Sequence, residues 1–259
     1  FDKLDIDVQI IRHGKFKSAV EPFMLNKMSI ENREQVKLLL NSFSNNLMDS
    51  IANQRKISLQ TVQNHADNLS LNSAKDCHKL KYVDELFYQD QVEKILLEIC
   101  GNEKLNTISL NKYSKVASKE KKKISKNKIA IIYATGAINS GKGDENSIGS
   151  ATTVKAIRKA TKDKNVKGIV FRINSGGGSA LASDVILREV ILAKKEKPFV
   201  VSLGDYAASG GYYIACAADS IVANPTTLTG SIGVFGIIPN LKNFYKNKLG
   251  INIDTVNTN

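Results

Sequence analysis

Hydrophobic and polar residues follow two different patterns in the two halves of the chain. In the second half, runs of apolar residues predict buried strands, and segments with helical periodicity lie between them. The expected strands are 128–138, 166–173, 198–204 and 220–225, and the expected helices are 152–163, 180–196 and 209–219. Apolar strands that alternate with helices are typical of a largely parallel sheet. The pattern therefore predicts an α/β core in this half.

The first half is expected to be mainly helical. Residues 4–12 alternate apolar and polar side chains, as a half-buried strand does. Ser29 is placed to cap a helix in which apolar residues recur at steps of three and four between residues 36 and 51. A further helix is predicted over 82–100 and is expected to end at Gly101.

Composition and charge narrow the classes of function. The chain of 259 residues has a formal net charge of +12, which by itself would suit a nucleic acid or an anionic surface. However, 31 of the 37 basic residues are lysine, and no interleaving of aromatic and basic residues of the kind that binds RNA occurs. We therefore interpret the charge as solvated surface and expect no nucleic-acid partner.

Neither a metal site nor a membrane span is indicated by the sequence. The three cysteines lack a CxxC pair, and the three histidines form no HExxH motif. No apolar run reaches the ~18–20 residues that a transmembrane helix needs. The segment 136–142 nearly matches a phosphate-binding loop, but it lacks the magnesium-binding Ser or Thr and is followed by no helical pattern. A surface loop is the better interpretation.

Two small-residue loops carry the candidate chemistry, because each follows a predicted strand and precedes a predicted helix. In the segment 174–179 (NSGGGS), three glycines leave backbone N–H groups open to an anion or to the oxyanion of a tetrahedral intermediate. In the segment 207–211 (AASGG), small neighbours expose the hydroxyl of Ser209, as in a nucleophile elbow. Loops of this kind meet at the carboxyl ends of parallel strands, where open α/β sheets place their sites.

A nucleophilic serine needs a base, and no histidine lies near these loops in the sequence. A lysine could serve if burial lowered its pKa from ~10.4 towards neutrality. Composition alone does not choose among the 31 lysines.

Three segments resemble the signal peptide peptidase A (protease IV) group of the S49 serine peptidase family, in its long tandem-repeat form. They are 14–23 (GKFKSAVEPF), 174–186 (NSGGGSALASDVI) and 200–236 (VVSLGDYAASGGYYIACAADSIVANPTTLTGSIGVFG). The resemblance implies a Clp/crotonase-like fold of repeated ββα units and a homo-oligomer, a tetramer in this family. It implies peptide substrates, no metal or organic cofactor, and a membrane anchor missing from this chain. The implied location is the bacterial inner (cytoplasmic) membrane, with the catalytic domain on the periplasmic side.

Matched by position, the resemblance implies that Ser209 is the nucleophile and Lys17 the general base. Ser231 corresponds to the serine that hydrogen-bonds the lysine amine, and Gly177 and the N–H of Gly210 correspond to the oxyanion hole. For Lys17 to act as a base, we expect its side chain to be buried and free of carboxylate partners. Glu21 is the main candidate for such a partner, and an ion pair with it would raise the pKa of Lys17. Where the family usually has proline, this chain has Gly176, which would leave the oxyanion loop less rigid.

The resemblance to the tandem-repeat form implies the domain organisation, and a weak internal similarity between residues 3–8 (KLDIDV) and 248–253 (KLGINI) fits it. We expect a tandem duplication truncated at both ends. Residues 1–101 would be the C-terminal part of the first repeat and carry the base. Residues 102–127 would be a basic linker, and 128–259 the N-terminal part of the second repeat, with the nucleophile.

The expected function is that of a serine endopeptidase with a Ser/Lys dyad, which degrades cleaved signal peptides at the membrane. Two other classes remain open. One is a crotonase-like acyl-CoA enzyme, which would share the fold and the N–H oxyanion hole. The other is a catalytically dead scaffold that binds peptides without cleaving them.

Overall fold

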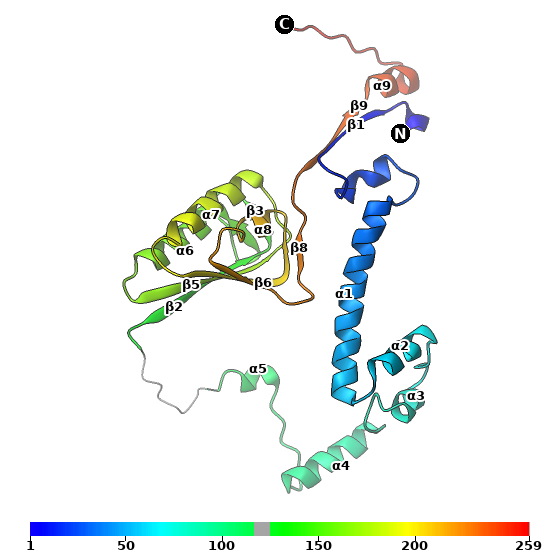
Figure 1. Cartoon of the computed structure of the whole chain (residues 1–259), viewed down its shortest axis with the longest axis vertical. Coiled ribbons are helices and arrows are strands. Elements are labelled where there is room, and N and C mark those ends of the chain that lie inside the picture. Colours follow the sequence, from blue (N-terminus) through cyan, green and yellow to red (C-terminus); the bar gives the residue numbers. More distant parts are fainter. Residues whose placement is uncertain (117–124, 259) are drawn as a thin grey trace. The chain divides into compact units, whose positions relative to one another are not determined.

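The computed structural model describes residues 1–116 and 125–258 and divides into two compact units (Figure 1). The first unit comprises Phe1–Phe43 together with Lys126–Asn259, and the second comprises Ser44–Ser125. The predicted basic linker 102–127 contains a short helix at Leu110–Tyr113, and residues 117–124 of it lie outside the described part of the chain. The boundaries predicted for the two repeats concern duplication and stay a prediction.

A parallel sheet forms the centre of the first unit. Its strand order is β2-β5-β6-β7, and β8 also pairs with β6 beyond the end of β7. All of these pairings are parallel, so the predicted α/β core with a parallel sheet is confirmed. The strands are β2 (Lys128–Thr135), β5 (Val166–Ser175), β6 (Phe199–Ala208), β7 (Ser220–Val222) and β8 (Leu228–Gly230). A smaller parallel pair consists of β3 (Ala137–Asn139) and β4 (Ser147–Gly149).

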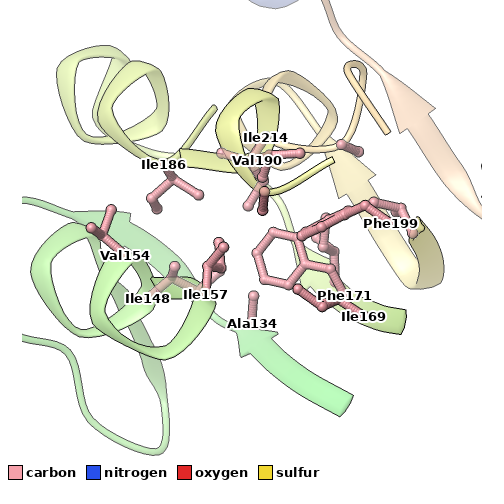
Figure 2. Packing of buried hydrophobic residues seen from close by; sticks show 14 of the residues in the cluster. Ala134, Ile148, Val154, Ile157, Ile169, Phe171, Ile186, Val190, Phe199 and Ile214 are labelled. Atoms are coloured by element: carbon pink, nitrogen blue, oxygen red, sulfur yellow. The ribbon is translucent and has the colours of Figure 1, made fainter. Parts of the chain in front are cut away.

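Helices α6 (Ser150–Lys162) and α7 (Ala180–Ala193) lie side by side over one face of this sheet (Figure 1). The hydrophobic core lies between these helices and the sheet. Within it, Phe171 of β5 and Phe199 of β6 meet edge to face with ring centroids 6.0 Å apart. Figure 2 shows Ile157 of α6 and Ile186 of α7 pointing into the same layer. The apolar run of β2 is buried on one face only, because Ile129, Ile131 and Tyr133 are exposed. This corrects the expectation that β2 is a fully buried strand.

The two ends of the chain meet in a separate antiparallel ribbon of the same unit. Strand β1 (Asp7–Arg12) pairs with β9 (Phe235–Asn240), so that Asp7 is opposite Asn240 and Arg12 is opposite Phe235. After β1 the chain forms the 3-10 helix η2 (Ser18–Phe23) and then α1 (Ile30–Arg55). Ser29 caps α1 as predicted, because its hydroxyl accepts the backbone N–H of Asn32 at 3.0 Å. The unit also contains η1 (Asp2–Leu4) and α9 (Lys242–Leu249).

The second unit consists of the end of α1 and short helices. These are α2 (Leu59–Asp67), α3 (Ala74–Lys79), α4 (Gln89–Cys100) and α5 (Leu110–Tyr113). The helix predicted over 82–100 begins only at Gln89, where the N-cap Tyr88 donates its backbone N–H to the Gln91 side chain. Gly101 ends α4 in the left-handed conformation, as the sequence predicts.

Two further elements near the strand ends differ from the prediction. The apolar run 128–138 is broken at Gly136, which has a φ of +95° and separates β2 from β3. The helix expected over 209–219 is only one turn long, α8 (Gly210–Tyr213), and turns follow it. Both breaks lie beside the loops that carry the candidate chemistry.

Candidate active site

Ser209 stands at a strained turn between β6 and α8. Its φ of +53° and ψ of −121° are rare for a residue with a side chain, and such a conformation costs ~1–3 kcal/mol unless its surroundings hold it. Its backbone N–H donates to the carbonyl of Gly230 at 2.8 Å, which ties the turn to the end of β8. The turn therefore presents a half-buried hydroxyl at the carboxyl end of the sheet.

The triple-glycine loop between β5 and α7 lies against this serine. A Cβ atom added to Gly177 would be 2.7 Å from the backbone nitrogen of Gly210 and 2.8 Å from the Cβ of Ser209. Real Cβ atoms do not approach so closely, so only glycine fits at this position. The two loops that the sequence singled out thus meet, as predicted.

The N–H of Gly177 already has a partner in this structure. It donates to the hydroxyl of Ser175 at 3.1 Å, and that hydroxyl donates to the carbonyl of Gly136 at 2.6 Å. The N–H groups of Gly178 and Gly210 have no acceptor among residues 1–116 and 125–258. Gly178 is therefore an oxyanion donor candidate that sequence reasoning missed; only hydrogen-bond geometry distinguishes it from its neighbour.

The side chain of Lys17 contacts the two residues that follow Gly230, the residue that accepts the Ser209 N–H. Its Nζ donates to the carbonyl of Ser231 at 3.1 Å, the carbonyl of Ile232 at 3.4 Å and the hydroxyl of Ser231 at 3.5 Å. The side chain is half-buried rather than fully buried as expected. Among the described residues, no carboxylate forms an ion pair with it. The structure therefore brings Lys17 and Ser231 together across 214 positions of sequence.

The carboxylate of Glu21 is directed to the start of α1 rather than to the lysine. It accepts the hydroxyl of Ser29 at 2.5 Å, the backbone N–H of Ser29 at 3.2 Å and the side-chain amide of Asn32 at 3.0 Å. These hydrogen bonds, led by the Ser29 hydroxyl, hold the pKa of Glu21 below its ordinary value, and the charge of Arg12 contributes. The guanidinium of Arg12 in turn donates to the carbonyl of Lys17 at 3.3 Å. Arg12 therefore holds the backbone at Lys17, and Glu21 holds the segment that follows to the start of α1.

Ser209 and Lys17 are joined through consecutive residues of one loop. Gly230 accepts the N–H of Ser209, and the next residue, Ser231, accepts the ammonium of Lys17. Within the described residues, no hydrogen bond links Lys17 Nζ to Ser209 Oγ. Catalytic hydrogen bonds are often long before substrate binds and tighten in the complex. The arrangement suits a serine nucleophile whose proton passes to a nearby amine.

A cavity of about 410 Å³ opens beside Ser209. Its walls are largely apolar, and Ser209 lies in its lining with Gly178, Tyr212, Tyr213 and Val234. The hydroxyl of Tyr213 donates to Asp184 at 3.1 Å, and this contact raises the pKa of the phenol. Sequence reasoning missed Tyr212 and Tyr213 as site residues, because the sequence indicated only that they continue the helix after Ser209. The cavity has the character of a pocket for an apolar side chain.

The charged residues suggest no further centre in the described part. Across residues 1–116 and 125–258, no three His, Cys, Asp or Glu side chains gather closely enough to hold a metal ion. In the same residues, no helix has both the length and the apolar character needed to cross a bilayer.

The fold and the site define an α/β protein with a strained serine at a strand end, a glycine loop against it and a lysine on the neighbouring loop. The sequence profile of peptidase family S49 matches residues 1–99 and 191–259, and the chain belongs to this family. This agrees with the resemblance on which the residue assignments rest.

Curated relatives match the chain over nearly its whole length. Protease 4 of Haemophilus influenzae is 36% identical, over 99% of this chain and 44% of its own length. Protease 4 of Salmonella typhi is 39% identical, over 99% of this chain and 43% of its own length. The chloroplastic serine protease SPPA of Arabidopsis thaliana is 35% identical, over 99% of this chain and 39% of its own length. The chain thus spans less than half the length of these relatives.

Solved structures are similar over smaller parts. A mutant of the 1510-N membrane-bound stomatin-specific protease, in complex with a substrate peptide, is 24% identical over 42% of this chain and 47% of its own, with a TM-score of 0.34. A probable enoyl-CoA hydratase from Mycobacterium smegmatis is 21% identical over 29% of this chain and 37% of its own, with a TM-score of 0.23.

Proposed function

We propose that this protein is a serine endopeptidase in which Ser209 is the nucleophile and Lys17 the general base. The observation that carries the proposal is the convergence of both residues on one loop, where Gly230 holds the Ser209 turn and Ser231 accepts the Lys17 ammonium. Membership of family S49 supports the same chemistry.

In the proposed mechanism, Ser209 Oγ attacks the scissile carbonyl of a bound peptide while Lys17, in its neutral form, takes the hydroxyl proton. The oxyanion that forms is stabilised by backbone N–H groups from Gly210 and from the glycine loop, where Gly177 or Gly178 is the donor. Lys17 then gives the proton to the leaving amine, which departs and leaves an acyl group on Ser209. Water attacks the ester in the second half of the reaction, with Lys17 again as base.

Ser231 is proposed to orient the lysine amine through both protonation states. An ammonium needs acceptors, and a neutral amine also offers a lone pair that needs a donor. The Ser231 hydroxyl can serve either need, since it both accepts and donates, and it lies 3.5 Å from Lys17 Nζ. The carbonyls of Ser231 and Ile232 can accept an N–H group from either state, but they cannot donate to the lone pair of the neutral amine.

The proposed substrates are cleaved signal peptides, and the proposed place of action is the bacterial inner membrane, with the catalytic domain on the periplasmic side. The largely apolar cavity beside Ser209 supports an apolar substrate segment. The names of the S49 relatives support a protease, and the longer relatives leave room for a membrane anchor and for the contacts of a homo-oligomer, a tetramer by resemblance.

The test combines active-site labelling with turnover of a quenched fluorescent peptide that has an apolar sequence. A fluorophosphonate probe should label wild-type protein at Ser209, and Ser209→Ala should remove both labelling and cleavage. Lys17→Ala should abolish cleavage and slow labelling, because the hydroxyl loses its base. Lys27→Ala is the matched control, since Lys27 is exposed and lines no cavity beside Ser209 or Lys17.

Three results would contradict the proposal. Labelling that persists in Ser209→Ala would show that another residue is the nucleophile. Peptide binding without cleavage by wild-type protein would favour a scaffold, and tight binding of coenzyme A would favour the crotonase-like alternative.

A further inference from the structure

A second cavity borders the pocket beside Ser209 and is lined by the proposed base. Its volume is about 640 Å³, and Ile232 lines both cavities. Lys17 and Ser231 form part of its wall. The apolar part of the wall comes from the segment before η2 and from α1, β8 and β9. Its residues are Phe16, Val36, Leu38, Leu39, Leu228 and Phe235.

Several polar groups that line this cavity are already bonded within the protein. The amide nitrogen of Gln35 donates to the carbonyl of Phe16 at 3.0 Å, and that of Asn32 donates to Glu21. Lys15 is ion-paired with Glu31. What the cavity offers to a ligand is therefore mainly apolar surface, together with the Lys17 amine, the His13 imidazole and the Ser18 hydroxyl.

We propose that this cavity binds the amine-side half of the peptide substrate, the residues that follow the scissile bond, and that it selects apolar side chains there. The inference rests on the proposed function and adds a subsite to it. The base that deprotonates Ser209 must later give a proton to the leaving amine, so that amine comes within hydrogen-bond reach of Lys17 Nζ. The residues attached to the leaving amine then lie against the wall that contains Lys17.

The division of the substrate between the two cavities follows from the same chemistry. The acyl half stays covalently attached to Ser209 after the first step, so its side chains belong in the cavity that Ser209 lines. The amine half leaves from the lysine side, and Ile232 lies at the boundary that the scissile bond would cross. An apolar amine-side subsite would add binding energy that raises the rate of acylation only for substrates that carry residues there.

The experiment compares two substrates with the same acyl half. One is a quenched peptide with two leucines after the scissile bond, and the other is a small-alcohol ester that has no residues on the leaving side. The variant Leu39→Gln changes an apolar wall position without loss of helix propensity. Leu40→Gln is the matched control, because Leu40 is the next residue of α1, is exposed, and does not line the cavity.

In Leu39→Gln, the ratio of kcat/KM for the peptide to kcat/KM for the ester should fall about 10-fold, as for loss of one apolar contact in a specificity pocket. In Leu40→Gln the ratio should stay at the wild-type value. A peptide with two serines in place of the leucines should lose rate with wild-type protein and should respond little to Leu39→Gln. If Leu39→Gln does not fold, Leu38→Gln tests the same wall.

An unchanged ratio in Leu39→Gln would overturn the inference. Equal loss on both substrates, with an altered sedimentation coefficient, would also overturn it and would indicate that a second copy of the chain covers the groove. If wild-type protein cleaved neither substrate, the proposed function itself would fail, which distinguishes that outcome from failure of the subsite alone.

Discussion

The contact of Gly177 with the Ser209 turn gives a sharp test of the site, through the change Gly177→Ala. The new methyl carbon would lie 2.7 Å from the nitrogen of Gly210, 2.8 Å from the Cβ of Ser209 and 3.0 Å from the carbonyl oxygen of Ala208. Two of these neighbours are backbone atoms, which do not move aside as the end of a flexible side chain does. The φ of Gly177 is +104°, a conformation that alanine avoids.

The loop must therefore shift away from Ser209, and the donors that face the oxyanion shift with it. Loss of one oxyanion donor costs about 10²- to 10³-fold in kcat, so we expect Gly177→Ala to lower kcat by at least about 100-fold. KM should change much less, because the cavity beside Ser209 is lined by Gly178 and not by Gly177. The backbone strain should also lower the free energy of unfolding, by about 1–3 kcal/mol. Steady-state kinetics on a peptide ester and urea denaturation measure the two effects separately.

Gly176→Ala is the matched control, one residue earlier in the same loop. A Cβ atom at Gly176 would meet no other atom within 4 Å, and Gly176 does not have a positive φ. This variant should keep kcat within a few-fold of wild type. Wild-type kcat in a folded Gly177→Ala protein, or equal loss in both variants, would refute the view that this close approach shapes the oxyanion site.

Three further predictions concern the lysine loop and the core. Ser231→Ala should lower kcat/KM by about 10- to 150-fold in ester kinetics, since a hydrogen bond to a charged group contributes roughly 1.5–3 kcal/mol; wild-type rates would show that the hydroxyl only shapes its turn. Glu21→Gln should destabilise the protein at neutral pH, because the amide places a donor against donors from Ser29 and Asn32. Because the pKa of Glu21 is lowered in the folded state, this carboxylate stabilises the fold above its ordinary pKa and loses that contribution as the pH falls through the lowered value. The urea midpoints of Glu21→Gln and wild type should therefore converge in acid. A gap between the midpoints that stays constant with pH would contradict this. Phe171→Ala should lower the free energy of unfolding by about 3–5 kcal/mol in urea titration, and a loss below about 1 kcal/mol would contradict the packing with Phe199.

Local chemistry explains which elements could be predicted from the sequence. The parallel sheet, the cap at Ser29 and the end of α4 at Gly101 follow from apolar periodicity and capping residues, which act over a few positions. The predicted start of α4 at residue 82 and the predicted length of α8 were wrong, because α4 begins at Gln89 and α8 ends at Tyr213. Apolar periodicity continues through residues where other interactions end the helix, such as the turns after Tyr213.

The candidate site depends on contacts that no local pattern encodes. The meeting of the two small-residue loops could be predicted, because parallel strands bring their carboxyl ends to one edge. The choice of Lys17 among the lysines required resemblance to a family, since its partner Ser231 lies 214 positions away. The partner of Glu21 was also unpredictable, because the same carboxylate could have faced the lysine had η2 turned differently against α1.

The pairing of β1 with β9 has a consequence for the timing of activity during synthesis. Lys17 follows the first strand of that ribbon, and its acceptors Ser231 and Ile232 precede the last. During synthesis, a chain that has been translated only as far as residue 230 contains the Ser209 turn but not the strand that completes the ribbon. The nascent chain would then carry its nucleophile without a base in place. The proposed peptidase activity would therefore begin only after translation has passed residue 240, the last residue of β9.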